Sequence, residues 1–286
     1  MMCRMFTLPA SYEEIIAHKR KVLAQLQVIT PLASLRALAS MQDRPQDVSS
    51  AMRESGVGVL ARVHDPAGTL AGGEAVPYDP VALARRLVRQ GAQALAVATS
   101  KHFHGGSIEH LTHVANAVRV PVIRLDYVLD EYQVVETRAA GGDGLILIAS
   151  LLSRLDEDLE RSLISITQRN LLTVIAQVNS AEELQAVLPY EPRVIAINNC
   201  DPLTGAVDLT LTSRLLELVP GHISVISMGG IHAPEDVAAV MTGVDGVLVP
   251  QELLLMTDTA EAIRQMLGIY MPPSALDSDP PSSTTR

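Results

Sequence analysis

The 286-residue chain is long enough for two average domains or for one large α/β barrel, so its pattern of elements must decide between them. Hydrophobic residues make up 48% of the sequence, with two Phe and no Trp, which predicts a core of Leu, Val, Ile and Ala typical of strands buried on both faces. The net charge of -10 and the absence of a basic run argue against nucleic acid as a partner.

The cysteines and the apolar runs predict where the protein resides. Cys3 and Cys200 form neither a disulfide framework nor a zinc set. No window approaches the ~18 uninterrupted apolar residues of a membrane span, and the first residues lack the apolar run of an export signal. We therefore expect a soluble, cytoplasmic protein without a membrane partner.

Residues 1–56 are predicted to form an N-terminal helical extension. Ser11 and Glu14 have the spacing of a capping box before a helix, a second helix is expected over 31–40, and a third ends at Gly56. No strand pattern competes with helix in this region.

From Val57 the pattern changes to short apolar runs that recur roughly every 26 residues, the spacing of βα units. The eight runs cover residues 57–63, 94–99, 121–126, 144–149, 171–178, 193–198, 222–227 and 245–249. Amphipathic segments separate them, and several open with an expected N-cap residue, namely Asp79, Ser107, Asp130, Ser180 and Asp208. Residues 57–268 are therefore predicted to be an α/β protein of the (β/α)8 TIM-barrel type, and the Pro- and Ser-rich tail 269–286 to be disordered.

The first strand, 57–63, ends in a polar turn that begins His64-Asp65-Pro66. The C-terminal ends of barrel strands carry the active site in folds of this type. Arg62 and its neighbours are therefore candidates for functional residues.

Several phrases of the chain, including SSAMRESGVGVLARV, ATSKHFHGGSIEHL, DEYQVVETRAAGG and SMGGIHAPEDV, together resemble indole-3-glycerol-phosphate synthase. The resemblance runs from roughly residue 13 to 267. It implies a (β/α)8 barrel with a helical extension and a carboxy-lyase of tryptophan biosynthesis. That enzyme closes an indole ring from a phosphorylated carboxyphenylamino-deoxyribulose, with loss of carbon dioxide and then water, and the resemblance implies no cofactor.

The resemblance also assigns the family's catalytic positions to residues of this sequence. Leu60 stands where the family has Glu, Arg62 where it has Lys, and His102 where it has a second Lys. A further Lys and two further Glu correspond, in chain order, to Leu125, Gln177 and Met228. Of the family's inward polar residues, Asn199 is the one expected to be retained. Most of the groups that would transfer protons are thus replaced. Because such catalytic groups act together, losing several of them should lower the reaction rate by orders of magnitude even when the fold is intact.

The family's phosphate site is implied at glycine turns after the seventh and eighth strands. Gly229-Gly230 keeps the first turn. The second reads Val249-Pro250-Gln251, and proline has no N–H to donate.

Each retained residue has a structural interpretation beside its functional one. Arg62 could hold a carboxylate or could pair with Asp65 or Asp126, and Asn199 could serve chemistry or only satisfy loop backbone. Gly229-Gly230 could bind phosphate or serve only as a turn. His102 could act as an acid near neutral pH.

Three functions remain open from the sequence. The first is the family's reaction with His102 as acid and Arg62 as carboxylate clamp. The second is a non-catalytic barrel that binds a phosphorylated or carboxylated metabolite, or a partner protein. The third and weakest is a metal site at His64, His102 and His104, because residues two apart on an extended strand end share a face. The main interpretation assigns no metal, and the oligomeric state stays open.

Overall fold

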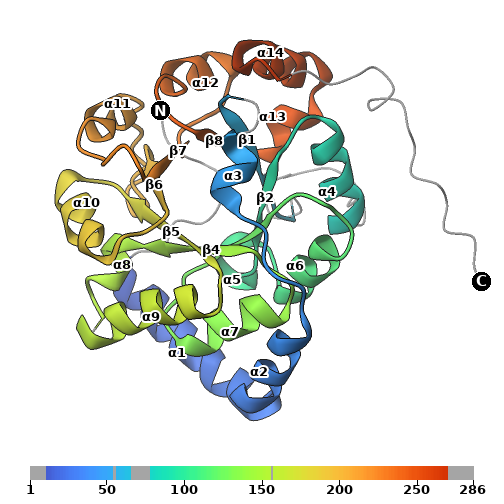
Figure 1. Ribbon diagram of the computed structural model, residues 1–286, viewed down its shortest axis with the longest axis vertical. Coiled ribbons are helices and arrows are strands. Elements are labelled where there is room, and N and C mark those ends of the chain that lie inside the picture. Colours follow the sequence, from blue (N-terminus) through green and yellow to red (C-terminus); the bar gives the residue numbers. More distant parts are fainter. Residues whose placement is uncertain (1–10, 54–55, 66–77, 156, 270–286) are drawn as a thin grey trace, which may run out of the picture.

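The computed structural model describes residues 11–53, 56–65, 78–155 and 157–269. Within these ranges the chain forms a closed barrel of eight parallel strands in sequence order, β1 to β8, with helices around it (Figure 1). The strands are β1 Gly58–Val63, β2 Ala94–Ala98, β3 Val122–Leu125, β4 Gly144–Ile148, β5 Thr173–Val178, β6 Val194–Asn198, β7 Ser224–Met228 and β8 Gly246–Val249. The predicted (β/α)8 barrel is confirmed, and the predicted tail lies outside the described residues from 270 onward.

The helices after the strands follow the predicted amphipathic segments, and short helices are added between them. They are α4 Pro80–Arg89, α5 Lys101–His104, α6 Ile108–Ala115, α7 Glu131–Ala139, α8 Ala149–Leu152, α9 Glu157–Arg169, α10 Ala181–Val187, α11 Leu211–Leu216, α12 Pro234–Val240, α13 Gln251–Leu255 and α14 Thr257–Leu267, with a 3-10 turn η2 Leu188–Tyr190. The short helices α5 and α8, which follow β2 and β4 directly, were not expected from the sequence pattern.

Four predicted N-caps are confirmed, because side-chain oxygens of these residues accept backbone N–H groups of the first turn. They are Asp79, Ser107, Asp130 and Ser180. Asp208 is a correction: α11 has Thr210 at its N-cap position, and Asp208 instead accepts from the amide and hydroxyl of Thr210 in the turn before the helix.

The strands alternate between two apolar layers, as the two-residue period of a strand requires. Val59 and Ala61 face the surrounding helices, whereas Leu60 lies in the barrel interior with Ile123 and Ile175. Both layers are buried, which explains why the strands read as continuous apolar runs. The same alternation decides which side chains reach the mouth of the barrel.

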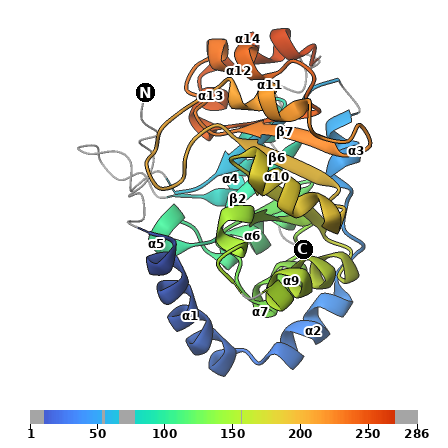
Figure 2. The same ribbon diagram turned by 90° about the vertical axis from the view of Figure 1, so that its left-hand side faces the viewer.

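The extension consists of α1 Tyr12–Ile29, α2 Leu32–Met41 and α3 Val48–Arg53, so the predicted helices are confirmed. Ser11 caps α1 by accepting from the amide of Glu14. Figure 2 shows α1 beginning beside α5 at one end of the barrel, turning into α2 in a V, and the chain continuing to α3 at the other end. The extension is thus a strap along one side of the barrel.

The strap closes the bottom of the barrel with Met52, which is fully buried. A Cβ on Gly58 would lie 2.9 Å from Met52 Cα, and one on Gly246 would lie 2.7 Å from Met52 Sδ. The buried Met52 therefore requires glycine at the start of β1 and of β8. Among the described residues no single helix is long and apolar enough to cross a membrane; α1 and α2 have that length and composition only as a pair, and a bend of 77° separates them.

Candidate functional site

A cavity of about 170 Å³ opens at the C-terminal ends of the strands. Arg62 from β1, Gln177 from β5 and Met228 from β7 line it, and so does Leu125 from β3. Leu60 lies one layer deeper, buried in the interior. The structure therefore brings four of the positions singled out in the sequence together at one mouth, with a fifth below them.

Gln177 is buried, and its side chain takes part in no hydrogen bond with the other described residues. Its amide lies at the cavity wall, where it can donate to or accept from a bound molecule. A neutral amide does not exchange a proton near neutral pH. This position is suited to recognition.

Asn198, the last residue of β6, lines the cavity, and Asn199 does not. Asn199 is buried outside the barrel wall, where its Nδ2 donates to Ser227 Oγ and to the Met228 carbonyl, both at 3.0 Å. Its Oδ1 accepts from the amide of Thr212 at 3.2 Å and from the hydroxyl of Thr212 at 2.8 Å. These contacts tie the first turn of α11 to β7. The strand alternation, which moves each neighbouring side chain to the opposite face, accounts for the difference between the two asparagines.

His102 and His104 lie on helix α5, not on an extended strand end, so they do not share a face and that expectation is wrong. His102 is exposed and stacks on His18 of α1 with ring centroids 4.4 Å apart. His104 lines the cavity and stacks on Tyr127 at 5.0 Å. Of the two histidines of α5, His104 is therefore the one at the cavity.

Two cavity groups have pKa values far from neutral. Burial, reinforced by the positive charge of Arg62, lowers the pKa of His104 to about 3, so its imidazole is neutral at physiological pH. Burial also raises the pKa of Tyr127 to about 12. Neither group is poised to exchange a proton near pH 7.

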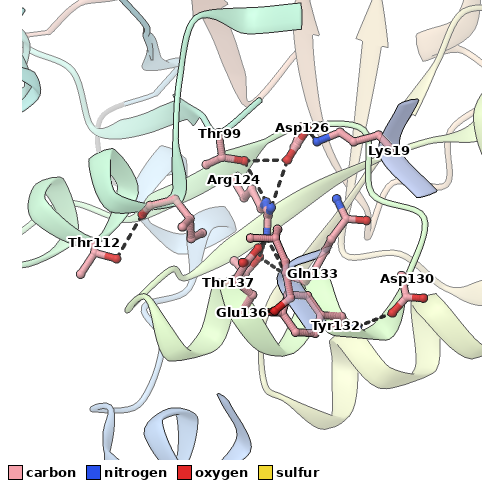
Figure 3. Close-up of polar contacts among 12 residues, drawn as sticks. Lys19, Thr99, Thr112, Arg124, Asp126, Asp130, Tyr132, Gln133, Glu136 and Thr137 are labelled. Carbon is pink, nitrogen blue, oxygen red and sulfur yellow. Dashed lines mark hydrogen bonds and ion pairs between the residues drawn. The ribbon is translucent and has the colours of Figure 1, made fainter. Parts of the chain in front are cut away.

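The carboxylate at the cavity, Asp126, is held by a buried cluster of charges (Figure 3). Lys19 reaches from α1 to form an ion pair with Asp126 Oδ1, and Arg124 Nη2 lies 3.0 Å from Oδ2. Thr99 donates a further hydrogen bond to Oδ2 at 2.8 Å. Burial alone would raise the pKa of Asp126, but Lys19 and Arg124 outweigh it and hold that pKa below its usual range.

Arg124 extends this cluster away from the cavity. Its Nη1 lies 2.8 Å from Glu136 Oε2 on α7 and donates to the Gln133 carbonyl at 2.8 Å. Sequence reasoning missed Lys19, although a signal exists: it continues the buried stripe of α1 formed by Tyr12, Ile15 and Leu23 at helical spacing. A lysine on an apolar stripe indicates a buried partner.

Gly229 and Gly230 adopt φ values of +75° and +72°, which favour glycine. A Cβ on Gly229 would lie 2.0 Å from Asn198 Oδ1, and one on Gly230 would lie 2.4 Å from Val207 Cγ1. These contacts alone require glycine at both positions. Both residues also line the cavity, so the turn and binding interpretations are compatible.

His64 is fully buried, and its Nε2 lies 3.6 Å from Glu252 Oε1 of α13. The neighbouring Gln251 accepts from the His64 amide at 3.0 Å and donates to the His64 carbonyl at 3.1 Å, so it fastens the end of β1 to α13. Within the described ranges no group of three or more His, Cys, Asp or Glu residues could hold a metal ion. The described geometry therefore gives no support to the metal hypothesis.

Comparison with known proteins decides the family. A model of the family described as indole-3-glycerol phosphate synthase matches residues 12–266. The chain belongs to this family. It is 35% identical over 265 residues to the indole-3-glycerol phosphate synthase of Rippkaea orientalis, covering 90% of this chain and 89% of the relative. It is 34% identical over 259 residues to that of Nocardioides sp., covering 90% and 98%.

Membership of the indole-3-glycerol phosphate synthase family indicates a function of the kind found in tryptophan biosynthesis. Leu125 and Met228 have no ionisable group, and both line the cavity. The finer question is therefore what this mouth does with a bound molecule.

Proposed function

We propose that this protein binds a phosphorylated or carboxylated small molecule in the barrel-mouth cavity without carrying out the ring closure of its family. The observation that carries the proposal is the cavity wall, where Leu125, Gln177 and Met228 occupy the strand ends. None of these side chains can transfer a proton. Ring closure with loss of carbon dioxide and water requires an acid and a base near the substrate.

The other titratable groups of the wall support the same proposal. Asp126 is locked as a carboxylate by Lys19 and Arg124, and the pKa of His104 is lowered to about 3. Arg62 stays protonated, because a guanidinium does not titrate in this range, so it supplies positive charge but no proton.

The wall does contain what an anionic ligand needs. Arg62 can form paired hydrogen bonds with a carboxylate or phosphate. Gln177 and Asn198 offer neutral amides, and Phe103 and Tyr127 offer apolar surface. We therefore favour a small anionic molecule over a nucleic acid, a membrane or a partner protein, and we place the protein in the cytoplasm.

The proposal is tested by separating binding from turnover. The purified protein is incubated with the family's phosphorylated carboxyphenylamino-deoxyribulose substrate while indole fluorescence and thermal unfolding are recorded. We expect the unfolding temperature to rise by several degrees at saturating substrate, without product beyond a heat-killed control. The Arg62→Ala variant, purified in the same way, should lose most of the thermal shift.

Two results would overturn the proposal. Indole fluorescence that grows with protein concentration and disappears in Arg62→Ala would establish the family's carboxy-lyase reaction, which membership of the family favours as the second candidate. No thermal shift with the substrate, with sugar phosphates or with aromatic carboxylates would remove the binding function.

A further inference from the structure

A second cavity, of about 440 Å³, lies at the other end of the barrel, beside the N-terminal ends of β5 and β6. It is lined by residues 44–47 of the strap, by residues 168 and 171–174 between α9 and β5, and by residues 191 and 193 before β6. The strap segment is anchored, because Arg138 Nη2 donates to the Asp43 carbonyl and Asp143 Oδ1 accepts from the amide of Gln46. The cavity is thus a formed feature of the fold, within the range of ~300–1,000 Å³ that ligand pockets occupy.

Two turns that line this cavity use a left-handed backbone without glycine. After α4, α7 and α12 the chain turns toward the next strand through Gly91, Gly141 and Gly243, with φ between +80° and +101°. The corresponding residues after α9 and after η2 are Leu171, with φ of +63°, and Glu191, with φ of +50°. These two are the non-glycine residues of positive φ in the described ranges, and both line the cavity. Since a side chain strains this conformation, the structure keeps these two side chains where glycine would suit the backbone better.

Four charged side chains line the cavity, and two of them pair with each other. Arg193 Nη1 lies 3.3 Å from Asp47 Oδ2. Arg44 and Glu191 form no ion pair with any other residue that the structure describes. One guanidinium and one carboxylate are therefore left for a ligand. A bound anion would meet the like charge of Glu191 and a bound cation that of Arg44, whereas a zwitterion matches both.

The apolar part of the lining indicates what else the ligand contains. Leu171 is 60% exposed, whereas Leu172 and Val174 are buried, and all three line the cavity. An apolar group that covers Leu171 would remove its surface from water, which favours binding.

We propose that this cavity binds an apolar α-amino acid, with its carboxylate on Arg44, its ammonium group on Glu191 and its side chain against Leu171. The site lies at the opposite end of the barrel from the mouth, so it does not depend on the function proposed for the mouth.

The test is calorimetric titration of the full chain with L-phenylalanine and L-leucine. Wild type should bind both, and Arg44→Gln should bind L-phenylalanine roughly 10-fold more weakly, the effect of losing a hydrogen bond between charged groups. Arg20→Gln is the matched control, because Arg20 is an exposed arginine of the strap that does not line the cavity. Phenethylamine and 3-phenylpropanoate, which each lack one of the two charged groups, should bind roughly 10-fold more weakly than L-phenylalanine.

The Leu171→Gly variant separates binding from folding. Glycine relieves the left-handed backbone, so this variant should unfold at nearly the same temperature as wild type. It should bind L-phenylalanine roughly 5-fold more weakly, because the apolar contact is lost.

Two sets of results would overturn the proposal. Wild type that binds neither amino acid, or that binds phenethylamine or 3-phenylpropanoate as tightly as L-phenylalanine, would show that the cavity does not recognise an amino acid. Equal affinities of wild type, Arg44→Gln and Leu171→Gly would place the bound amino acid elsewhere on the chain.

Discussion

The two halves of the barrel mouth use their polar groups in opposite ways. Near β3, the charges of Lys19, Asp126 and Arg124 satisfy one another. Near β5 to β7, the side chain of Gln177 and the amides of the Gly229–Ile231 loop have no hydrogen-bond partner within the described residues. The first half therefore holds the molecule together, and the second is available to a ligand.

This difference also separates charged groups that stabilise the fold from polar groups that a ligand can reach. Asp126 would look like a catalytic carboxylate from its place at a strand end, yet its two oxygens are occupied by the extension and by its own strand. A charged residue at the mouth of a barrel becomes a candidate for chemistry only when its partners leave it accessible to a ligand.

The largest expected effect comes from breaking the paired half. Lys19→Met should lower the free energy of unfolding by about 3 to 5 kcal/mol, because it leaves Asp126 buried with an incomplete set of charges. The matched control is Arg36→Met, which removes another ion pair between the extension and the barrel. Arg36 Nη2 lies 2.6 Å from Glu131 Oε1, but the Arg36 side chain is 60% exposed, so the loss should stay below ~1 kcal/mol.

Chemical denaturation of the two variants beside wild type measures both values. If Lys19→Met lowers the unfolding free energy no more than Arg36→Met does, the buried ion pair does not anchor the extension. The charged cluster near β3 would then not be what stabilises this half of the mouth.

A second prediction compares Asn199 with Gln177. Asn199→Ala should cost about 2 to 3 kcal/mol in unfolding free energy, because it removes four buried side-chain hydrogen bonds and leaves the amide of Thr212 without its acceptor. Gln177→Ala should cost less than ~1 kcal/mol, since its amide makes no hydrogen bond that the described residues supply.

The two variants should reverse their order when ligand is added. Gln177→Ala should show a smaller thermal shift with sn-glycerol 3-phosphate than Asn199→Ala, provided both are compared with their own ligand-free unfolding temperatures. A larger loss of thermal shift in Asn199→Ala would mean that the residue outside the barrel wall controls binding, contrary to its position.

The fold was predictable because its signal is local and repeated. Each apolar strand run, and each N-cap residue such as Asp79 or Ser180, can be recognised from a few neighbouring residues. The regular spacing of the runs is compatible with only a few chain topologies. The family resemblance put Arg62, Gln177 and Met228 at inward positions of the barrel, and all three line the cavity in the structure.

The site was less predictable where a strand ends. Asn198 and Asn199 are adjacent and identical, so a one-residue difference in register decides which lines the cavity. At His102 and His104 the chain has already turned into α5, where strand alternation no longer applies. Lys19 meets Asp126 across more than a hundred residues of sequence, a contact that no local pattern contains.

The smallest predicted effect concerns pH and the neutral imidazole of His104. An unfolded histidine takes up its proton near pH 6.5, whereas burial and Arg62 lower the pKa of folded His104 to about 3. Between these values the unfolded state binds the extra proton, so the free energy of unfolding falls as the pH falls from about 6.5 toward 3. At pH 5 this one group should account for about 2 kcal/mol of lost stability relative to pH 8.

His104→Gln should therefore reduce the difference in unfolding free energy between pH 8 and pH 5 by about 2 kcal/mol. His102→Gln is the control from the same helix, because His102 is exposed and outside the cavity. An unchanged pH dependence in His104→Gln would mean that His104 can be protonated in the folded protein near neutral pH. The mouth would then contain an acid suited to the family's reaction. That result would contradict the argument that no group at the cavity can transfer a proton near neutral pH.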